Sequence, residues 1–171
     1  MIIIGIDPGT ASTGYGIIEK IVPRHRGNKN KEQKNINLFR CLGYGLIKTT
    51  PAVPTPERLK KIHQELLKIL KTFKPTVLVM ESIYFFKNLK TAIPVSQAQG
   101  VILLAAAKKK IPVFQYTPLQ AKAIVTGYGR AEKKTVQKKI KSLLKLKELP
   151  KPDDAADALA IAMAHFLLKK G

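Results

Sequence analysis

An apolar, β-branched segment opens the chain and limits the folds that it can adopt. Residues 2–6 read Ile-Ile-Ile-Gly-Ile, with no polar residue to face solvent, so they predict a strand buried inside a sheet. Asp7 ends this run, and Pro8-Gly9 breaks it. A strand without a polar face needs cover on both sides, which favours an α/β fold.

The rest of the chain predicts strands and helices in alternation. Further strands are expected over residues 14–18, 39–47, 77–80 and 112–116. One helix is expected to begin with Thr55 as its N-cap and Pro56 at the first helical position, and to end at Lys74. Other helices are expected over residues 95–109, 131–146 and 153–168, with a turn at 127–129. The first three strands should form a meander and the later ones should pair in parallel, giving a mixed five-stranded sheet flanked by helices.

The chain is expected to form a single domain over residues 1–171, with one insertion. A polar, basic loop is predicted at about residues 20–38, between the second and third strands. Its cationic side chains are Arg24, Arg26, Lys29, Lys31 and Lys34.

A large excess of positive charge predicts a polyanionic partner. The sequence has 31 Lys and Arg against 11 Asp and Glu, a formal net charge of +20. Nucleic acid and an anionic membrane are the usual partners, and a lysine-rich solvated surface is the alternative. The first residues lack a basic signal segment and no apolar run could span a bilayer, so we expect a soluble, cytoplasmic protein. The single Cys41 excludes an internal disulfide and a multi-cysteine metal site.

The basic residues are concentrated in one part of the chain. Between Lys108 and Lys147 there are 12 Lys or Arg, and Glu132 is the one acid. A solvated helix face would mix both signs, so we favour a surface that follows a phosphate backbone.

The few acids lie where elements begin or end. The sequence has four aspartates, Asp7, Asp153, Asp154 and Asp157, and Glu81 follows the strand over 77–80. If the first and fourth strands are neighbours, Asp7 and Glu81 meet at one edge of the sheet. Asp154 and Asp157 are three residues apart, so they share one helix face. A pocket made only of carboxylates repels itself unless cations fill it, and hard oxygen ligands suit Mg²⁺ or Mn²⁺. Two such ions can flank a scissile phosphate.

Each acid also has a structural explanation. Asp153 or Asp154 is a reasonable N-cap of the last helix, and Asp7 could hydrogen-bond within its own turn. Glu81 could form an ordinary ion pair at the end of a strand. All of these explanations would have to hold at once, so we favour the metal site, with Asp153 left to cap the helix.

Several motifs in order resemble the RuvC family of Holliday junction resolvases. The opening Gly5-Ile-Asp7-Pro-Gly9 and Thr13-Gly-Tyr-Gly16 is similar to that of the family, as is Glu81 with Phe86-Lys-Asn88 after it. Ser96-Gln-Ala-Gln-Gly100, Gly127-Tyr-Gly129 with Ala131-Glu-Lys133, and Asp154-Ala-Ala-Asp-Ala-Leu-Ala160 resemble its later segments. The resemblance runs from Met1 to about His165.

The resemblance implies a ribonuclease H-like fold and a homodimer that nicks opposing strands of a four-way DNA junction symmetrically. It implies ligatable ends and a branch-migration motor of the RuvA–RuvB type as partner. Asp7, Glu81, Asp154 and Asp157 fall where the family places its metal ligands, for two Mg²⁺ or Mn²⁺ ions. Lys122 and Lys133 fall where basic residues contribute to catalysis. The side chains expected to contact DNA are Tyr84, by stacking on bases at the junction centre, and Phe85, Lys87, Arg130 and Lys134.

Other functions remain possible at this point. An actin-like ATPase also has an Asp and Gly after its first strand, but it needs two domains and a second phosphate loop. A basic architectural protein has the charge but no use for a carboxylate pocket. A ribonuclease H-like nuclease acting on structured RNA would use the same metal pocket.

Overall fold

A computed structural model describes residues 1–21, 38–82 and 89–168 of the chain. It contains β1 (Ile2–Asp7), β2 (Ser12–Lys20), β3 (Phe39–Lys48), β4 (Val77–Glu81) and β5 (Val113–Tyr116). The helices are α1 (Thr55–Phe73), α2 (Leu89–Lys108), α3 (Pro118–Thr126), α4 (Lys133–Leu144) and α5 (Asp153–Leu168).

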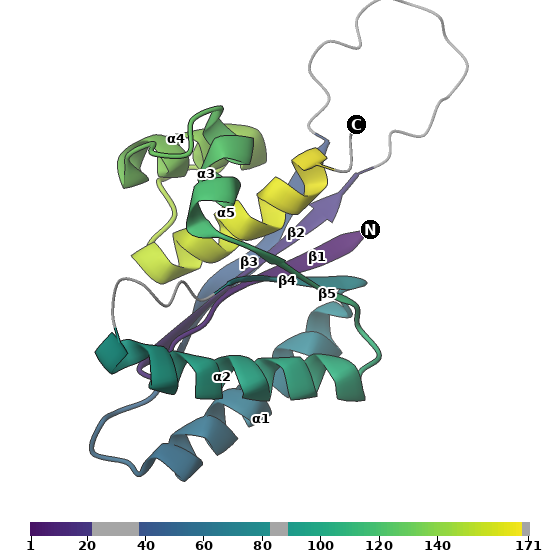
Figure 1. Ribbon diagram of the computed structural model, residues 1–171. Helices are drawn as coiled ribbons and strands as arrows, with labels where there is room; N and C mark the ends of the chain where they lie inside the picture. The colour runs from purple at the N-terminus through teal and green to yellow at the C-terminus, as the bar shows by residue number, and fades with distance from the viewer. Residues whose placement is uncertain (22–37, 83–88, 169–171) are drawn as a thin grey trace, which may run out of the picture.

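The strands form one mixed sheet in the order β3-β2-β1-β4-β5. The first three are antiparallel neighbours, and β4 lies parallel to both β1 and β5. This confirms the predicted meander, and it meets the condition, adjacent first and fourth strands, under which Asp7 and Glu81 were expected to lie at one edge. In Figure 1, α1 and α2 cover one face of the sheet, and α3, α4 and α5 lie on the other.

Alternate residues of the central strands pack into two separate hydrophobic cores, one on each face of the sheet. Ile3 of β1 belongs to the core beneath α5, whereas Ile4 and Ile6 belong to the core beneath α1 and α2. In β4, Val77 and Val79 face α5, and Leu78 and Met80 face the other way. This period of two places a purely apolar strand between two helical layers.

Three of the predicted helices have boundaries that differ from those expected. The N-cap of α1 is Pro54, and Thr55 is already helical without a side-chain cap bond. Helix α2 begins at Leu89, earlier than the predicted start at residue 95, and contains Pro94. Packing of Ala92, Ala98 and Ile102 outweighs the backbone hydrogen bond that the proline cannot donate. Helix α4 is shorter than predicted.

Helix α3 was not predicted at all. It has a capping box, in which the Thr117 hydroxyl accepts a hydrogen bond from the Gln120 backbone and the Gln120 side chain accepts one from the Thr117 backbone. Pro118 occupies its first turn, and Gly127 ends it in the left-handed conformation.

Candidate active site

The ends of β1 and β4 bring Asp7 and Glu81 to the same edge and the same face of the sheet. The register pairs Ile6 with Met80, so the next residue of each strand is an acid. Ile3 and Val79 face α5, and alternation places Asp7 and Glu81 on that face as well. Both carboxylates are half-buried.

Helix α5 crosses the sheet at unusually close range and carries the other acids to this edge. A Cβ atom on Gly14 would overlap the backbone carbonyl of Asp154, and one on Gly5 would overlap that of Ala158. Glycine in the strands and alanine in the helix therefore allow backbone to lie against backbone. The contact fixes the N-terminal end of α5, where Asp154 and Asp157 lie, beside the end of β1.

The electrostatics show that these acids interact. Burial, followed by the charges of Glu81, Asp157 and Asp154, raises the pKa of Asp7 to about 8. Burial and the charge of Asp157 raise the pKa of Glu81 to about 7. Lys133 opposes both shifts, and Lys122 opposes the shift at Glu81. Carboxyl groups that remain partly protonated near neutral pH indicate a site short of positive charge.

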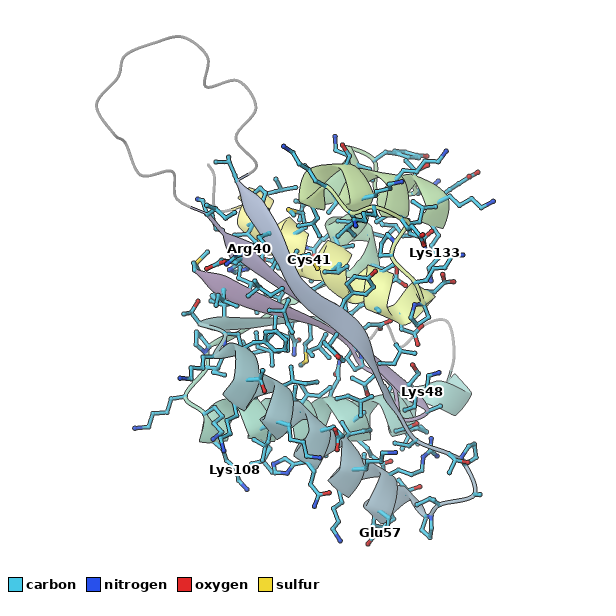
Figure 2. The ribbon with its side chains drawn as sticks, turned by 180° about the vertical axis from the view of Figure 1, so that it is seen from behind. Arg40, Cys41, Lys48, Glu57, Lys108 and Lys133 are labelled. Carbon is cyan, nitrogen blue, oxygen red and sulfur yellow. The ribbon has the colours of Figure 1, made fainter. Side chains whose placement is uncertain are left out.

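Both predicted lysines line a cavity next to the acids. Its volume is about 190 Å³, and its polar lining consists of Glu81, Lys122, Lys133 and Asp157. Helix α3 contributes Lys122, and the start of α4 contributes Lys133. The Lys133 Nζ lies 2.9 Å from Asp157 Oδ2. Figure 2 shows Lys133 beside the N-terminal end of α5.

Asp153 does not have the role predicted for it. It is the first helical residue of α5, and the backbone N–H groups of Ala155 and Ala156 bond to the Pro152 carbonyl. Its Oδ1 accepts a hydrogen bond of 3.2 Å from Gln137 Nε2, and its Oδ2 lies 3.4 Å from Lys133 Nζ. The carboxylate is therefore turned toward α4 instead of capping α5.

Known proteins are similar to this chain over most of its length. Residues 3–165 match the family described as "Crossover junction endodeoxyribonuclease RuvC". The crossover junction endodeoxyribonuclease RuvC of Desulforamulus reducens is 49% identical, over 96% of this chain and 93% of that protein. The chain belongs to the RuvC family. The RuvC of Petrotoga mobilis is 47% identical over the same shares of the two chains.

Solved structures agree with this assignment. Thermus thermophilus RuvC in complex with Holliday junction substrate superposes with a TM-score of 0.85 at 34% identity, covering 99% of this chain and 95% of that one. The fold of this RuvC family member is thus ribonuclease H-like, as predicted. The yeast mitochondrial Holliday junction resolvase shares the fold, with a TM-score of 0.63 at 14% identity.

Nucleases of the RuvC family are metal-dependent, and the acidic edge of this member has the donor chemistry for a hard cation. Its donors are carboxylate oxygens, and their raised pKa values reflect charge that a divalent ion would neutralise. Across residues 1–21, 38–82 and 92–168, no three His, Cys, Asp or Glu side chains converge closely enough to hold an ion as they stand.

One residue near the site was missed in the sequence. The Gln99 side chain, on α2, donates a hydrogen bond of 2.7 Å to the backbone carbonyl of Glu81 and so ties the end of β4 to α2. It belongs to the Ser96–Gly100 segment of the resemblance, which carried no assigned role.

The structure describes only some of the residues that are expected to contact DNA. Tyr84, Phe85 and Lys87 lie outside the described residues. Arg130 and Lys134 are both exposed near the start of α4. No helix in the described part of the chain is long and apolar enough to cross a membrane.

Proposed function

We propose that this RuvC family member is an endonuclease that resolves four-way DNA junctions by paired, symmetric nicks. The observation that carries the proposal is that Asp7 and Glu81 end neighbouring strands at one edge of the sheet, within the electrostatic influence of Asp154 and Asp157 and beside two lysines. The complex of the Thermus thermophilus protein with a Holliday junction supports a junction as substrate. The net charge of +20 suits a partner with four phosphate-lined arms.

The four carboxylates would hold two divalent ions, Mg²⁺ or Mn²⁺. Such ions would supply an activated water and stabilise charge on the leaving oxygen of the phosphodiester. Asp7 and Glu81 provide the fixed side of the site, because each ends a buried strand. Asp154 and Asp157 provide the side that depends on the seating of α5.

Lys122 and Lys133 would act on the phosphate. Both ammonium groups line the cavity that Glu81 and Asp157 also line, so a phosphate bound there would meet positive charge from α3 and α4. Arg130 and Lys134 would contact the backbone further along the same strand. Tyr84, Phe85 and Lys87 would act at the junction centre, with Tyr84 stacking on an unpaired base.

A homodimer would place two such sites on one junction. The support comes from α2, where Ile93 is 70% exposed and Leu104 is 51% exposed. Ile93, Gly100 and Leu104 share a helix face by their spacing, and a Cβ on Gly100 would meet only open space. A branch-migration motor of the RuvA–RuvB type would deliver the junction.

Cleavage of three substrates of equal length tests this function. End-labelled four-way DNA junction, linear duplex and a structured RNA are incubated with the chain in Mg²⁺ and in moderate salt. We expect cleavage of the junction alone, with products that a ligase reseals without processing. Equal cleavage of linear duplex, or cleavage confined to the RNA, would overturn the assignment.

A further inference from the structure

Asp153 stands outside the four proposed metal ligands, yet its carboxylate faces the lysine of the site. Two groups of α4 hold it: Gln137 Nε2 at 3.2 Å from Oδ1 and Lys133 Nζ at 3.4 Å from Oδ2. Gln137 is 9% exposed, so its amide is a fixed donor that selects one orientation of the Asp153 carboxylate. Lys133 therefore lies between two aspartates, since its Nζ is also 2.9 Å from Asp157.

This arrangement affects how firmly Lys133 binds Asp157. An ammonium paired with Asp157 alone would compete with a cation for that carboxylate. Asp153 is a second anion that pairs with the Lys133 ammonium. Lys133 therefore keeps a counter-ion when Asp157 binds a cation. Asp153 also adds negative charge near the acidic edge. Both effects act in the same direction and favour a cation at Asp157.

We propose that Asp153 is a positioning residue, which shares Lys133 with Asp157 and so keeps Asp157 able to bind a divalent cation. The proposal rests on the proposed function, because it takes Asp157 as a metal ligand and Lys133 as a group of the active site. The relevant atoms are exposed: the side chain of Asp153 is 65% accessible and that of Lys133 is 43% accessible. The coupling is therefore modest and sensitive to salt.

Calorimetric titration with Mn²⁺, without DNA, measures the effect directly. At low ionic strength we expect Asp153→Asn to weaken Mn²⁺ binding about two- to fivefold, the range of an exposed ion pair. The loss should shrink as salt is added, and it should be clearly smaller when Asp153→Asn is made in a Lys133→Met background, where only the direct effect of the Asp153 charge remains. Asp153→Glu should restore part of the affinity. Gln137→Leu, which frees the carboxylate without changing charge, should shift binding in the same direction by less.

Glu148→Gln is the matched control, because it removes one exposed acid from the connection between α4 and α5. It should leave Mn²⁺ binding unchanged, and thermal denaturation should show that each variant is folded. If Asp153→Asn binds Mn²⁺ as the wild type does, or loses as much affinity without Lys133 as with it, the proposal is wrong while the proposed function stands. Absence of Mn²⁺ binding by the wild type would overturn both.

Discussion

Gly14 of β2 lies directly against the backbone carbonyl of Asp154, with no room between them for a Cβ atom. The same contact that seats α5 on the sheet thus sets the position of an acid at the active edge. Disturbed packing between Gly14 and α5 should therefore also disturb the proposed active site.

Substitution of Gly14 by alanine should therefore impair cleavage beyond its effect on folding. The new methyl group would push the start of α5 away from the sheet. Asp154 and Asp157 would then lie further from Asp7. We expect a loss of about 1–3 kcal/mol in the free energy of unfolding, as for other overpacked sites. Junction cleavage by protein that is still folded should fall at least tenfold, measured well below the melting temperature.

Gly43→Ala provides the control for this substitution. A Cβ on Gly43 would lie 3.3 Å from the ring of Phe73, on the α1 side of the sheet and away from α5. A smaller loss of stability than for Gly14→Ala, with normal cleavage, is expected, because only the tip of a side chain has to move. Equal loss of cleavage in both variants would show that α5 has no special role.

The raised pKa of Asp7 predicts how the stability of the metal-free protein depends on pH. Its folded pKa of about 8 lies above the ordinary aspartate pKa of 3.8, so the folded state binds the proton more tightly than the unfolded state does. The stability due to this group is complete below pH 4 and is lost as pH rises toward 8. In the presence of a metal chelator, Asp7→Asn should therefore have a larger free energy of unfolding than the wild type at pH 8.5. This difference in stability should be smaller at pH 5. Urea denaturation at the two pH values measures this. A variant less stable than the wild type at pH 8.5 would refute the account of Asp7.

The exposed face of α2 predicts the effect of a charge at the proposed dimer interface. Leu104→Glu should yield a folded monomer, because burial of a carboxylate in an apolar interface is unfavourable. The monomer should still bind Mn²⁺ but should not make paired nicks. Lys61→Glu, at an exposed position of α1, is the control. Light scattering gives the mass, and a dimeric Leu104→Glu protein would place the interface elsewhere.

Much of the sheet and part of the proposed site could be predicted from local patterns in the sequence. The apolar runs that end at Asp7 and Glu81 predicted two buried strands, although not that they pair, and the spacing of Asp154 and Asp157 predicted a shared helix face. Asp153 was assigned wrongly because its partners Gln137 and Lys133 lie on another helix, and nothing in the spacing along the chain relates α4 to α5. Helix α3 was missed although Thr117 and Gln120 have the spacing of a capping box, because its nine residues show no clear periodicity.

The central claim is that Asp154 and Asp157, together with Asp7 and Glu81, hold the cations that cleave a junction. The direct measurement is the rate of nicking of an end-labelled four-way junction by Asp154→Asn and Asp157→Asn, in Mg²⁺ and in Mn²⁺, with junction binding measured in parallel. Both variants should bind the junction at least as tightly as the wild type, because negative charge near the phosphates has been removed. Neither should nick it, whereas Asp153→Asn should retain most of the activity at saturating metal. Normal nicking by either Asp154→Asn or Asp157→Asn would contradict the account.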